Sequence, residues 1–225
     1  MVILDNRQNI RSFGRINGRS CSEKTTYILS DILPRYLFDP NGINPEQCNY
    51  LEIGFGYGEN LYKRALIDTD SNYIGCEIYS KGVANLVELI EKYSIKNIRI
   101  FNGDARILLE NIPNSSVDKI FILYPDPWPK KRQNKRRIIN EKFLELVHKK
   151  LKSYGTLFFA TDIVDYANWA LEKVNNTNLF VANFSSLLEV KNEPAWWIKT
   201  KYQKKALDEL RESYFMEFTA INTDN

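Results

Sequence analysis

The sequence predicts an α/β fold in which a mostly parallel, seven-stranded sheet carries helices on both faces. Short, continuous apolar runs alternate along the chain with segments that repeat apolar residues at helical spacing. Strands that are apolar throughout belong to sheets buried between helices, and such sheets are parallel. With 225 residues and 44% hydrophobic content, the chain is long enough to build one large core.

The expected elements follow in chain order. A polar, basic arm (1–25) precedes a segment with helical spacing at 25–37, which stops near Pro34, and a turn-rich connector at 40–46. Strands are then expected at 49–53, 73–78, 98–101, 117–124, 156–160, 180–184 and 215–221. Helices are expected from the glycine turn to 67 and at 80–93, 105–111, 141–151, 166–174 and 203–213. The sequence therefore divides into an arm, 1–25, and one domain, 26–225.

Composition argues against several classes of protein. No apolar run approaches the roughly 20 residues that span a bilayer, and the polar N-terminus lacks the apolar centre of a signal peptide. The three scattered cysteines, Cys21, Cys48 and Cys76, lack zinc-site spacing and fit a reducing cytoplasm. The single histidine, His148, lies in a lysine-rich helical pattern and is interpreted as a solvated surface residue. We expect no metal, no membrane contact and a cytoplasmic location.

Positive charge is concentrated although the net charge is only +3. Three clusters of cations stand beside aromatic or glycine-containing motifs. They comprise Arg7, Arg11, Arg15, Arg19 and Lys24; then the run from Lys130 to Arg137; then Lys199, Lys201, Lys204 and Lys205. One cluster alone is as easily a solvated face, but three together favour a surface that faces RNA or DNA.

A glycine-rich turn follows the first expected strand. It carries Gly54, Gly56 and Gly58, with Glu52 two residues before the first glycine. The third glycine comes one residue too early for the dinucleotide motif Gly-x-Gly-x-x-Gly, which counts against NAD. An acid here suits a cationic ligand such as S-adenosylmethionine, and glycines allow the backbone to approach it closely.

Two more acids end the next strands. Glu77 is placed to accept ribose hydroxyls, and Asp104 to accept from an adenine amino group. A glycine loop alone is only a tight turn, but with acids at the ends of two neighbouring strands the chain resembles the class I S-adenosylmethionine-dependent methyltransferases. That resemblance implies a Rossmann-like fold.

The stretch after the fourth expected strand reads Pro-Asp-Pro-Trp-Pro-Lys-Lys-Arg-Gln-Asn-Lys-Arg-Arg, residues 125–137. Asp126 would lie beside the methyl donor. Trp128 would be a stacking or wall residue, the alternative being a core tryptophan in a rigid turn. Methyltransferases of exocyclic amines carry a related Asp- or Asn-Pro-Pro-aromatic motif, but here the second proline is missing.

This stretch resembles the signature of the bacterial tRNA (guanine-N7-)-methyltransferase family. Further matches follow in the family's order: Arg-Ser-Phe-Gly-Arg at 11–15, Leu-Glu-Ile-Gly-Phe-Gly at 51–56, Ala-Thr-Asp at 160–162 and Thr-Lys-Tyr-Gln at 200–203. The resemblance implies methylation of tRNA, at guanosine 46 of the variable loop, with S-adenosylmethionine converted to S-adenosylhomocysteine. A monomer or a homodimer is expected.

The resemblance also implies residue roles. The cofactor site would be lined by Glu52, Gly54, Gly56, Gly58, Glu77, Asp104 and Asp126, with Asp126 also the catalytic carboxylate. Substrate would be bound by Lys130, Asp162, Thr200, Lys201, Tyr202 and Gln203, and we add Trp128, Arg132 and Arg136. Gln203 departs from the family's usual Glu, and Gln133 from a common His, so the role of position 203 stays open.

The chemistry agrees with the composition. Guanine N7 carries a free lone pair and no proton, so its methylation needs no strong general base. A chain with a single histidine is consistent with such a reaction. Positioning and a carboxylate near the developing positive charge would supply catalysis. Two alternatives remain: a methyltransferase of an exocyclic amine or small metabolite, and a non-catalytic RNA-binding subunit. Whether Asp126 contacts guanine or acts on the cofactor side also stays open.

Overall fold

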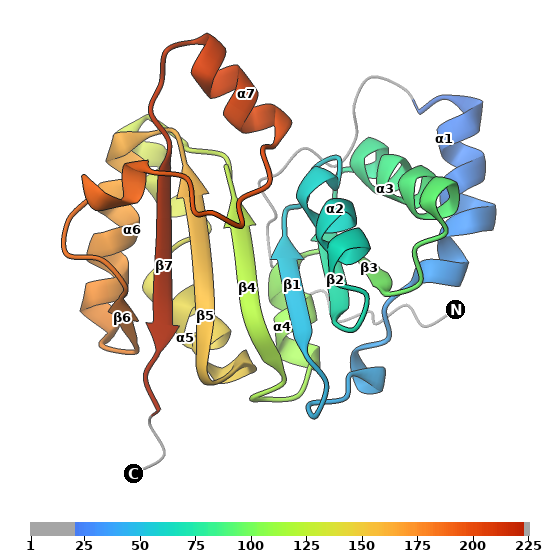
Figure 1. Ribbon diagram of the computed structural model, residues 1–225, viewed down its shortest axis with the longest axis horizontal. Helices are drawn as coiled ribbons and strands as arrows, with labels where there is room; N and C mark the ends of the chain where they lie inside the picture. Colours follow the sequence, from blue (N-terminus) through green and yellow to red (C-terminus); the bar gives the residue numbers. More distant parts are fainter. Residues whose placement is uncertain (1–20, 223–225) are drawn as a thin grey trace.

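Seven strands form one open sheet with helices on both faces (Figure 1). The computed structural model describes residues 21–222. In chain order the strands are β1 (Asn49–Ile53), β2 (Asn72–Glu77), β3 (Ile98–Asn102), β4 (Val117–Leu123), β5 (Leu151–Thr161), β6 (Phe180–Ala182) and β7 (Tyr214–Ala220). The predicted fold class is confirmed, and every expected strand is present.

The strand order is β3-β2-β1-β4-β5-β7-β6. Pairing is parallel from β3 to β5, and β7 runs antiparallel to both β5 and β6. Strand order reverses between β1 and β4, because the chain leaves β1 toward β2 and β3 and then returns to the other side of β1. Ligands of such sheets bind beyond the carboxyl ends of the strands at this reversal.

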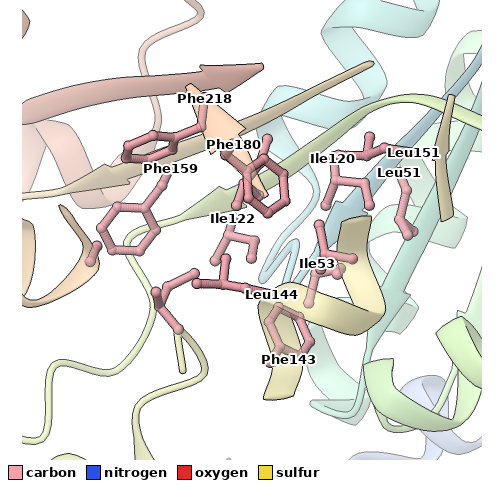
Figure 2. Packing of buried hydrophobic residues seen from close by; sticks show 14 of the residues in the cluster. Leu51, Ile53, Ile120, Ile122, Phe143, Leu144, Leu151, Phe159, Phe180 and Phe218 are labelled. Atoms are coloured by element: carbon pink, nitrogen blue, oxygen red, sulfur yellow. The ribbon is translucent and has the colours of Figure 1, made fainter. Parts of the chain in front are cut away.

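Helices cover the two faces unequally. They are α1 (Glu23–Tyr27), α2 (Glu59–Ile67), α3 (Ser80–Tyr93), α4 (Ala105–Asn111), α5 (Glu141–Lys150), α6 (Val164–Thr177) and α7 (Lys201–Asp208). One face carries α4, α5 and α6, which bury the largest core cluster against residues such as Leu51, Ile122 and Phe159 (Figure 2). Helices α1, α2 and α3 cover only the β1–β3 half of the other face.

The remaining half of that face lies under an irregular segment, residues 187–200. Its Trp197 packs against Phe158 and Phe215 of the sheet, with ring centroids 5.7 and 4.8 Å apart. From there the chain passes into α7, which lies beyond the carboxyl ends of β4 and β5 (Figure 1). This segment therefore joins the sheet face to the edge where ligands bind.

Several element boundaries differ from the prediction for local reasons. The helix expected at 25–37 begins earlier, because Ser22 caps α1, and continues as a π-helix (Ile28–Ile32) and a 3-10 helix (Leu33–Tyr36). Helix α7 begins at Lys201 rather than 203, because the Thr200 hydroxyl accepts a hydrogen bond from the Gln203 amide. The sequence pattern predicted no element in the basic run, which forms a 3-10 helix η4 (Lys131–Arg136).

Candidate active site

A cleft of about 760 Å³ opens at the carboxyl edge of the sheet. Its walls come from the glycine loop after β1, the ends of β2, β3 and β4, the basic run and α7. Of the predicted residues, it is lined by Gly54, Gly56, Glu77, Asp104, Asp126, Trp128, Arg136 and Tyr202. Glu52 lines a small pocket that shares Gly54 and Tyr202 with the cleft.

The glycine loop depends on glycine for its backbone shape. Gly54, Gly56 and Gly58 have φ angles of +72°, +56° and +77°, a region that side chains with a Cβ rarely adopt. A fourth glycine, Gly82 in α3, packs against this loop: a Cβ there would lie 2.0 Å from the Gly56 carbonyl oxygen. The sequence prediction missed Gly82, because a glycine inside a helical pattern has no local sign of such a contact.

Glu77 is held by backbone amides at the end of β2. Its Oε2 accepts from Gly56 N at 2.8 Å, and its Oε1 accepts from Ile78 N at 2.7 Å and Tyr79 N at 2.9 Å. Burial raises the pKa of this carboxyl, while the amide bonds oppose that shift. The carboxylate thus braces the glycine loop and keeps one lone pair of Oε2 for a ligand hydroxyl.

Glu52 is 3% exposed and faces the α2 side of the sheet. Its Oε2 accepts from Asn60 Nδ2 at 2.9 Å, and Asn60 Oδ1 in turn accepts from Arg64 Nε at 2.9 Å. Burial raises the pKa of Glu52 to about 7, and Asn60 and Arg64 only partly oppose the shift. A buried carboxyl of this kind is stabilised in its ionised form by a cationic ligand group.

Asp104 caps α4 and pairs with a cation that the sequence prediction did not consider. Its Oδ1 accepts from the backbone N and the Nε of Arg106, both at 2.9 Å, and its Oδ2 accepts from Arg106 Nη2 at 2.6 Å. Arg106 also lines the cleft. A ligand amino group would therefore meet Asp104 at one remaining lone pair of Oδ2, next to a guanidinium.

The Asp126 loop, residues 124–128, leaves the end of β4 with its acid exposed to solvent. Tyr124 and Trp128, at its two ends, have φ angles of +50° and +45°. Trp128 is half-buried and lines the cleft, so it is not a core residue. The guanidinium of Arg136 lies 4.9 Å from the centre of its ring.

The basic run is not uniform. Lys130 and Arg132 are exposed, as phosphate contacts require, and Lys135 lines the cleft. Arg137, however, has a side chain with 0% exposure, so the expectation that the whole run from Lys130 to Arg137 holds phosphates is wrong for this residue.

The other two cationic clusters are partly paired inside the protein. Arg7, Arg11, Arg15 and Arg19 lie outside the described residues, and Lys24 pairs with Glu88 of α3 at 2.6 Å. In the third cluster, Lys199 pairs with Glu193 at 3.3 Å and Lys205 with Glu209 at 3.9 Å. Both pairs are exposed, so they are weak enough to exchange with a phosphate.

The start of α7 is tied to the glycine loop. The Lys201 amide donates to Glu59 Oε2 at 2.6 Å, and its ammonium lies 4.2 Å from the ring centre of Tyr57. Tyr202 faces the cleft beside Gly56, and Thr200 is buried as the cap of the helix. Three of the four predicted α7 residues thus line the small pocket next to the glycine loop, and Tyr202 also lines the cleft.

Gln203 has a different place. It is 2% exposed; its Oε1 accepts from Trp197 Nε1 at 2.6 Å, and its Nε2 donates to Glu193 Oε1 at 2.7 Å. It is an interior residue that links α7 to the segment over the sheet face. Its role as a substrate contact stays a prediction.

Two further residues, Asp162 and His148, have partners that the sequence did not predict. Asp162, after β5, pairs with Arg211 Nη1 at 2.6 Å and has 14% side-chain exposure. His148 is half-buried, its Nε2 2.8 Å from the Ile221 carbonyl and its ring edge-on to Phe180. His148 therefore lies at the surface, as predicted, but is only partly solvated, because its ring packs on Phe180 and its Nε2 contacts the carbonyl of Ile221 just after β7.

Comparison with known proteins identifies the family to which the chain belongs. Residues 46–216 match a family model described as "Putative methyltransferase". A tRNA (guanine-N(7)-)-methyltransferase of Wolbachia pipientis wMel is 42% identical over 80% of this chain and 78% of its own length. One of Caulobacter sp. (strain K31) is 37% identical over 94% and 96%. The chain belongs to the tRNA (guanine-N(7)-)-methyltransferase family.

Other relatives in this group are longer. A protein of Rickettsia felis named "Bifunctional methyltransferase" is 36% identical over 100% of this chain, which spans 42% of that relative's length. Among solved structures, the 16S rRNA methyltransferase KamB has a TM-score of 0.56 at 12% identity, over 78% of this chain and 89% of its own. That likeness supports the Rossmann-like class I methyltransferase fold.

The residues of the cleft fit the cofactor that this family uses. S-adenosylmethionine carries an ammonium and a sulfonium, and Glu52, in the small pocket beside the cleft, is an acid whose pKa is raised by burial and only partly lowered by Asn60 and Arg64. Glu77 and Asp104 retain acceptor capacity on the next two strands. Among residues 21–222 no group of three or more His, Cys, Asp or Glu is placed to hold a metal ion. Within the same range, no helix is both long enough and apolar enough to cross a bilayer.

Proposed function

We propose that this protein transfers a methyl group from S-adenosylmethionine to N7 of guanine in tRNA. The observation that carries the proposal is the position of Asp126: an exposed carboxylate on the cleft wall, between the acids of β1–β3 and the cations of the basic run. The acids suit a cationic cofactor, the cations suit an RNA backbone, and Asp126 stands where the two meet.

The residues would divide the work as follows. Glu52 holds the cofactor's ammonium, while Glu77 and Asp104 accept from its ribose and adenine. When bound, S-adenosylmethionine supplies a sulfonium methyl group and is left as S-adenosylhomocysteine. Lys130 and Arg132 hold the RNA backbone, and Tyr202 closes the cleft beside Gly56.

Guanine N7 needs no base to remove a proton, because it carries a free lone pair. The guanine ring gains positive charge as N7 is methylated. The carboxylate of Asp126 stabilises that charge electrostatically and can accept from guanine N–H groups. Holding the base in line with the methyl group supplies the rest of the rate.

Trp128 is the proposed stacking surface for the guanine. Stacking of a base on an aromatic ring contributes about 1–3 kcal/mol. Trp128→Ala should therefore lower kcat/KM for tRNA by about 10- to 100-fold and leave affinity for S-adenosylhomocysteine unchanged, whereas Trp128→Phe should retain most of the activity. Normal kinetics of the alanine variant would make Trp128 a packing residue.

The decisive experiment is to incubate the full chain with labelled S-adenosylmethionine and an unmodified tRNA transcript, and then identify the modified nucleoside by mass. We expect 7-methylguanosine, at guanosine 46 of the variable loop. A methyl group on an exocyclic amine would favour the first alternative. Binding of tRNA without S-adenosylmethionine binding would favour a non-catalytic RNA-binding subunit. Sedimentation of the same sample would distinguish a monomer from a homodimer.

Affinity for RNA should also depend on salt. Cations that neutralise phosphates release counterions, so tRNA affinity should fall steeply as salt rises from about 50 to about 200 mM. Affinity that does not change over this range would exclude the basic run as the tRNA contact. A cytoplasmic location follows from the proposed substrate and is part of the same proposal.

A further inference from the structure

Arg137 ends the basic run but points into the protein. Its side chain has 0% exposure, and it is among the largest fully buried side chains. In sequence it looks like its neighbours Lys135 and Arg136, and all three residues border the cleft, but of the three only Arg137 is buried. A buried cation is retained only where several groups compensate for its lost hydration.

The guanidinium of Arg137 joins two loops at the carboxyl edge of the sheet. Its Nε donates to the Pro127 carbonyl oxygen at 2.9 Å, inside the Asp126 loop. Its Nη2 donates to the carboxylate of Asp165, in the first turn of α6, just after the loop that holds Asp162. The rings of Tyr166 and Trp169 lie 4.8 and 5.2 Å from its Cζ atom. One side chain therefore ties the loop after β4 to the helix after β5.

The Asp126 loop needs such support. Tyr124 and Trp128 hold positive φ angles at its two ends, and each such residue costs about 1–2 kcal/mol. Tyr124 is held at the first end, because its amide donates to Ala160 O at 2.7 Å and its hydroxyl bonds Ser213 Oγ at 3.0 Å. At the second end, Arg137 holds the carbonyl of the residue between Asp126 and Trp128.

We propose that Arg137 is a positioning residue: it fixes the Pro127 carbonyl and thereby sets where Asp126 and Trp128 stand in the cleft, and it is not a tRNA contact. The inference rests on the proposed function, because the effect is on the methyl-transfer step. Arginine is required because its planar fork reaches the carbonyl and the carboxylate together, whereas lysine has one charged nitrogen and no such fork.

The test compares Arg137→Gln and Arg137→Lys with the wild-type chain. We expect both to lower kcat at saturating tRNA and cofactor by about 10- to 100-fold, the range for a small misplacement of reacting groups. Affinity for S-adenosylhomocysteine, measured by calorimetry, should stay unchanged. Arg99→Gln is the matched control: Arg99 also donates to carbonyl oxygens, of Lys96 and Ile98, but it lies on β3 away from the cleft, so its kcat should be that of the wild type.

Salt dependence separates positioning from phosphate binding. The slope of log K against log salt for tRNA should be unchanged in Arg137→Gln, whereas Arg132→Gln should reduce it by about 1. A reduced slope in Arg137→Gln, or full activity in Arg137→Lys, would overturn the proposal.

The Asp165→Asn variant tests the proposal even if the Arg137 variants fail to fold. The Asp165 side chain is 70% exposed, so its substitution leaves the core intact, and we expect a smaller fall in kcat with unchanged cofactor affinity. Unchanged kcat would overturn the proposal. If the wild-type chain makes no 7-methylguanosine, the proposed function fails; if it does and the Arg137 variants turn over equally fast, only the role of Arg137 fails.

Discussion

The two halves of the cleft hold their acids in different ways. On the β1–β3 side, Glu77 accepts three backbone amides and Asp104 accepts a guanidinium and an amide, and Glu52, in the small pocket beside the cleft, is 3% exposed. On the β4 side, Asp126 is exposed to solvent. The acids of the first half are pre-organised by contacts within the protein, whereas under the proposed function an RNA base would complete the second half.

This difference separates the functions of the halves. Changes on the β1–β3 side should alter cofactor affinity and folding together, because the acids there also brace the loop. Changes at Asp126 should alter the reaction alone.

The largest effect should come from Asp126→Asn. Loss of one pre-placed electrostatic partner of the transition state typically costs about 10²- to 10³-fold in kcat, and the exposed position of Asp126 leaves folding untouched. We expect that fall in single-turnover methylation, with normal binding of S-adenosylhomocysteine. A variant with full activity would remove Asp126 from the mechanism, and one that loses cofactor binding would place it on the cofactor side.

Gly82→Ala should damage the pre-organised half. The new Cβ would lie 2.0 Å from the Gly56 carbonyl oxygen, so α3 or the glycine loop must move. Overpacking of this kind costs about 3 kcal/mol, visible in urea denaturation and in weaker S-adenosylhomocysteine binding. Gly42→Ala is the control, because its Cβ would meet only Asp39 Cβ at an ordinary 3.8 Å. Equal stability of the two variants would show that the loop tolerates displacement.

Gln203→Glu tests whether position 203 acts inside the protein. The substitution brings a carboxylate against Glu193, where Gln203 Nε2 now donates at 2.7 Å, and should lower the free energy of unfolding by about 2 kcal/mol. Adding Glu193→Gln returns a donor to the pair and should recover most of that loss, as a double-mutant cycle measures. Additive losses would mean that the two residues do not interact in solution.

The smallest effect is the pH dependence of cofactor affinity. Burial raises the pKa of Glu52 to about 7 from 4.5. The folded protein favours the neutral form of Glu52. The contribution of Glu52 to the free energy of unfolding is therefore fully present below about pH 4.5 and is lost as the pH rises toward 7. An ammonium prefers the ionised form, so affinity for S-adenosylhomocysteine should rise about tenfold per unit up to pH 7 and then level off.

Calorimetry between pH 6 and 8 measures this rise. Glu52→Gln, which cannot ionise, should bind more weakly and show a flatter profile, and this separates Glu52 from Glu77, whose pKa burial also raises. A wild-type affinity that does not vary with pH would exclude Glu52 as the partner of the ammonium.

Much of the fold followed from local patterns. The helices at 80–93 and 105–111 have the predicted bounds, because their apolar spacing and flanking turns are local properties of the chain. The acids Glu77, Asp104 and Asp126 meet at one cleft, because parallel strands bring their carboxyl ends to the same edge. The motif after β4 identified the family for the same reason: its residues are contiguous.

By itself, then, the sequence determined the α/β sheet, the edge that carries the cleft, the acids along it and the family. Only the tertiary structure decided which charges remain available. It buries Arg137 beneath the Asp126 loop, pairs Asp162 with Arg211, and turns Gln203 inward. The physical reason is that strand and helix patterns are local, whereas burial and ion pairing depend on residues that are distant in the chain and meet only when the sheet, α6 and α7 pack together.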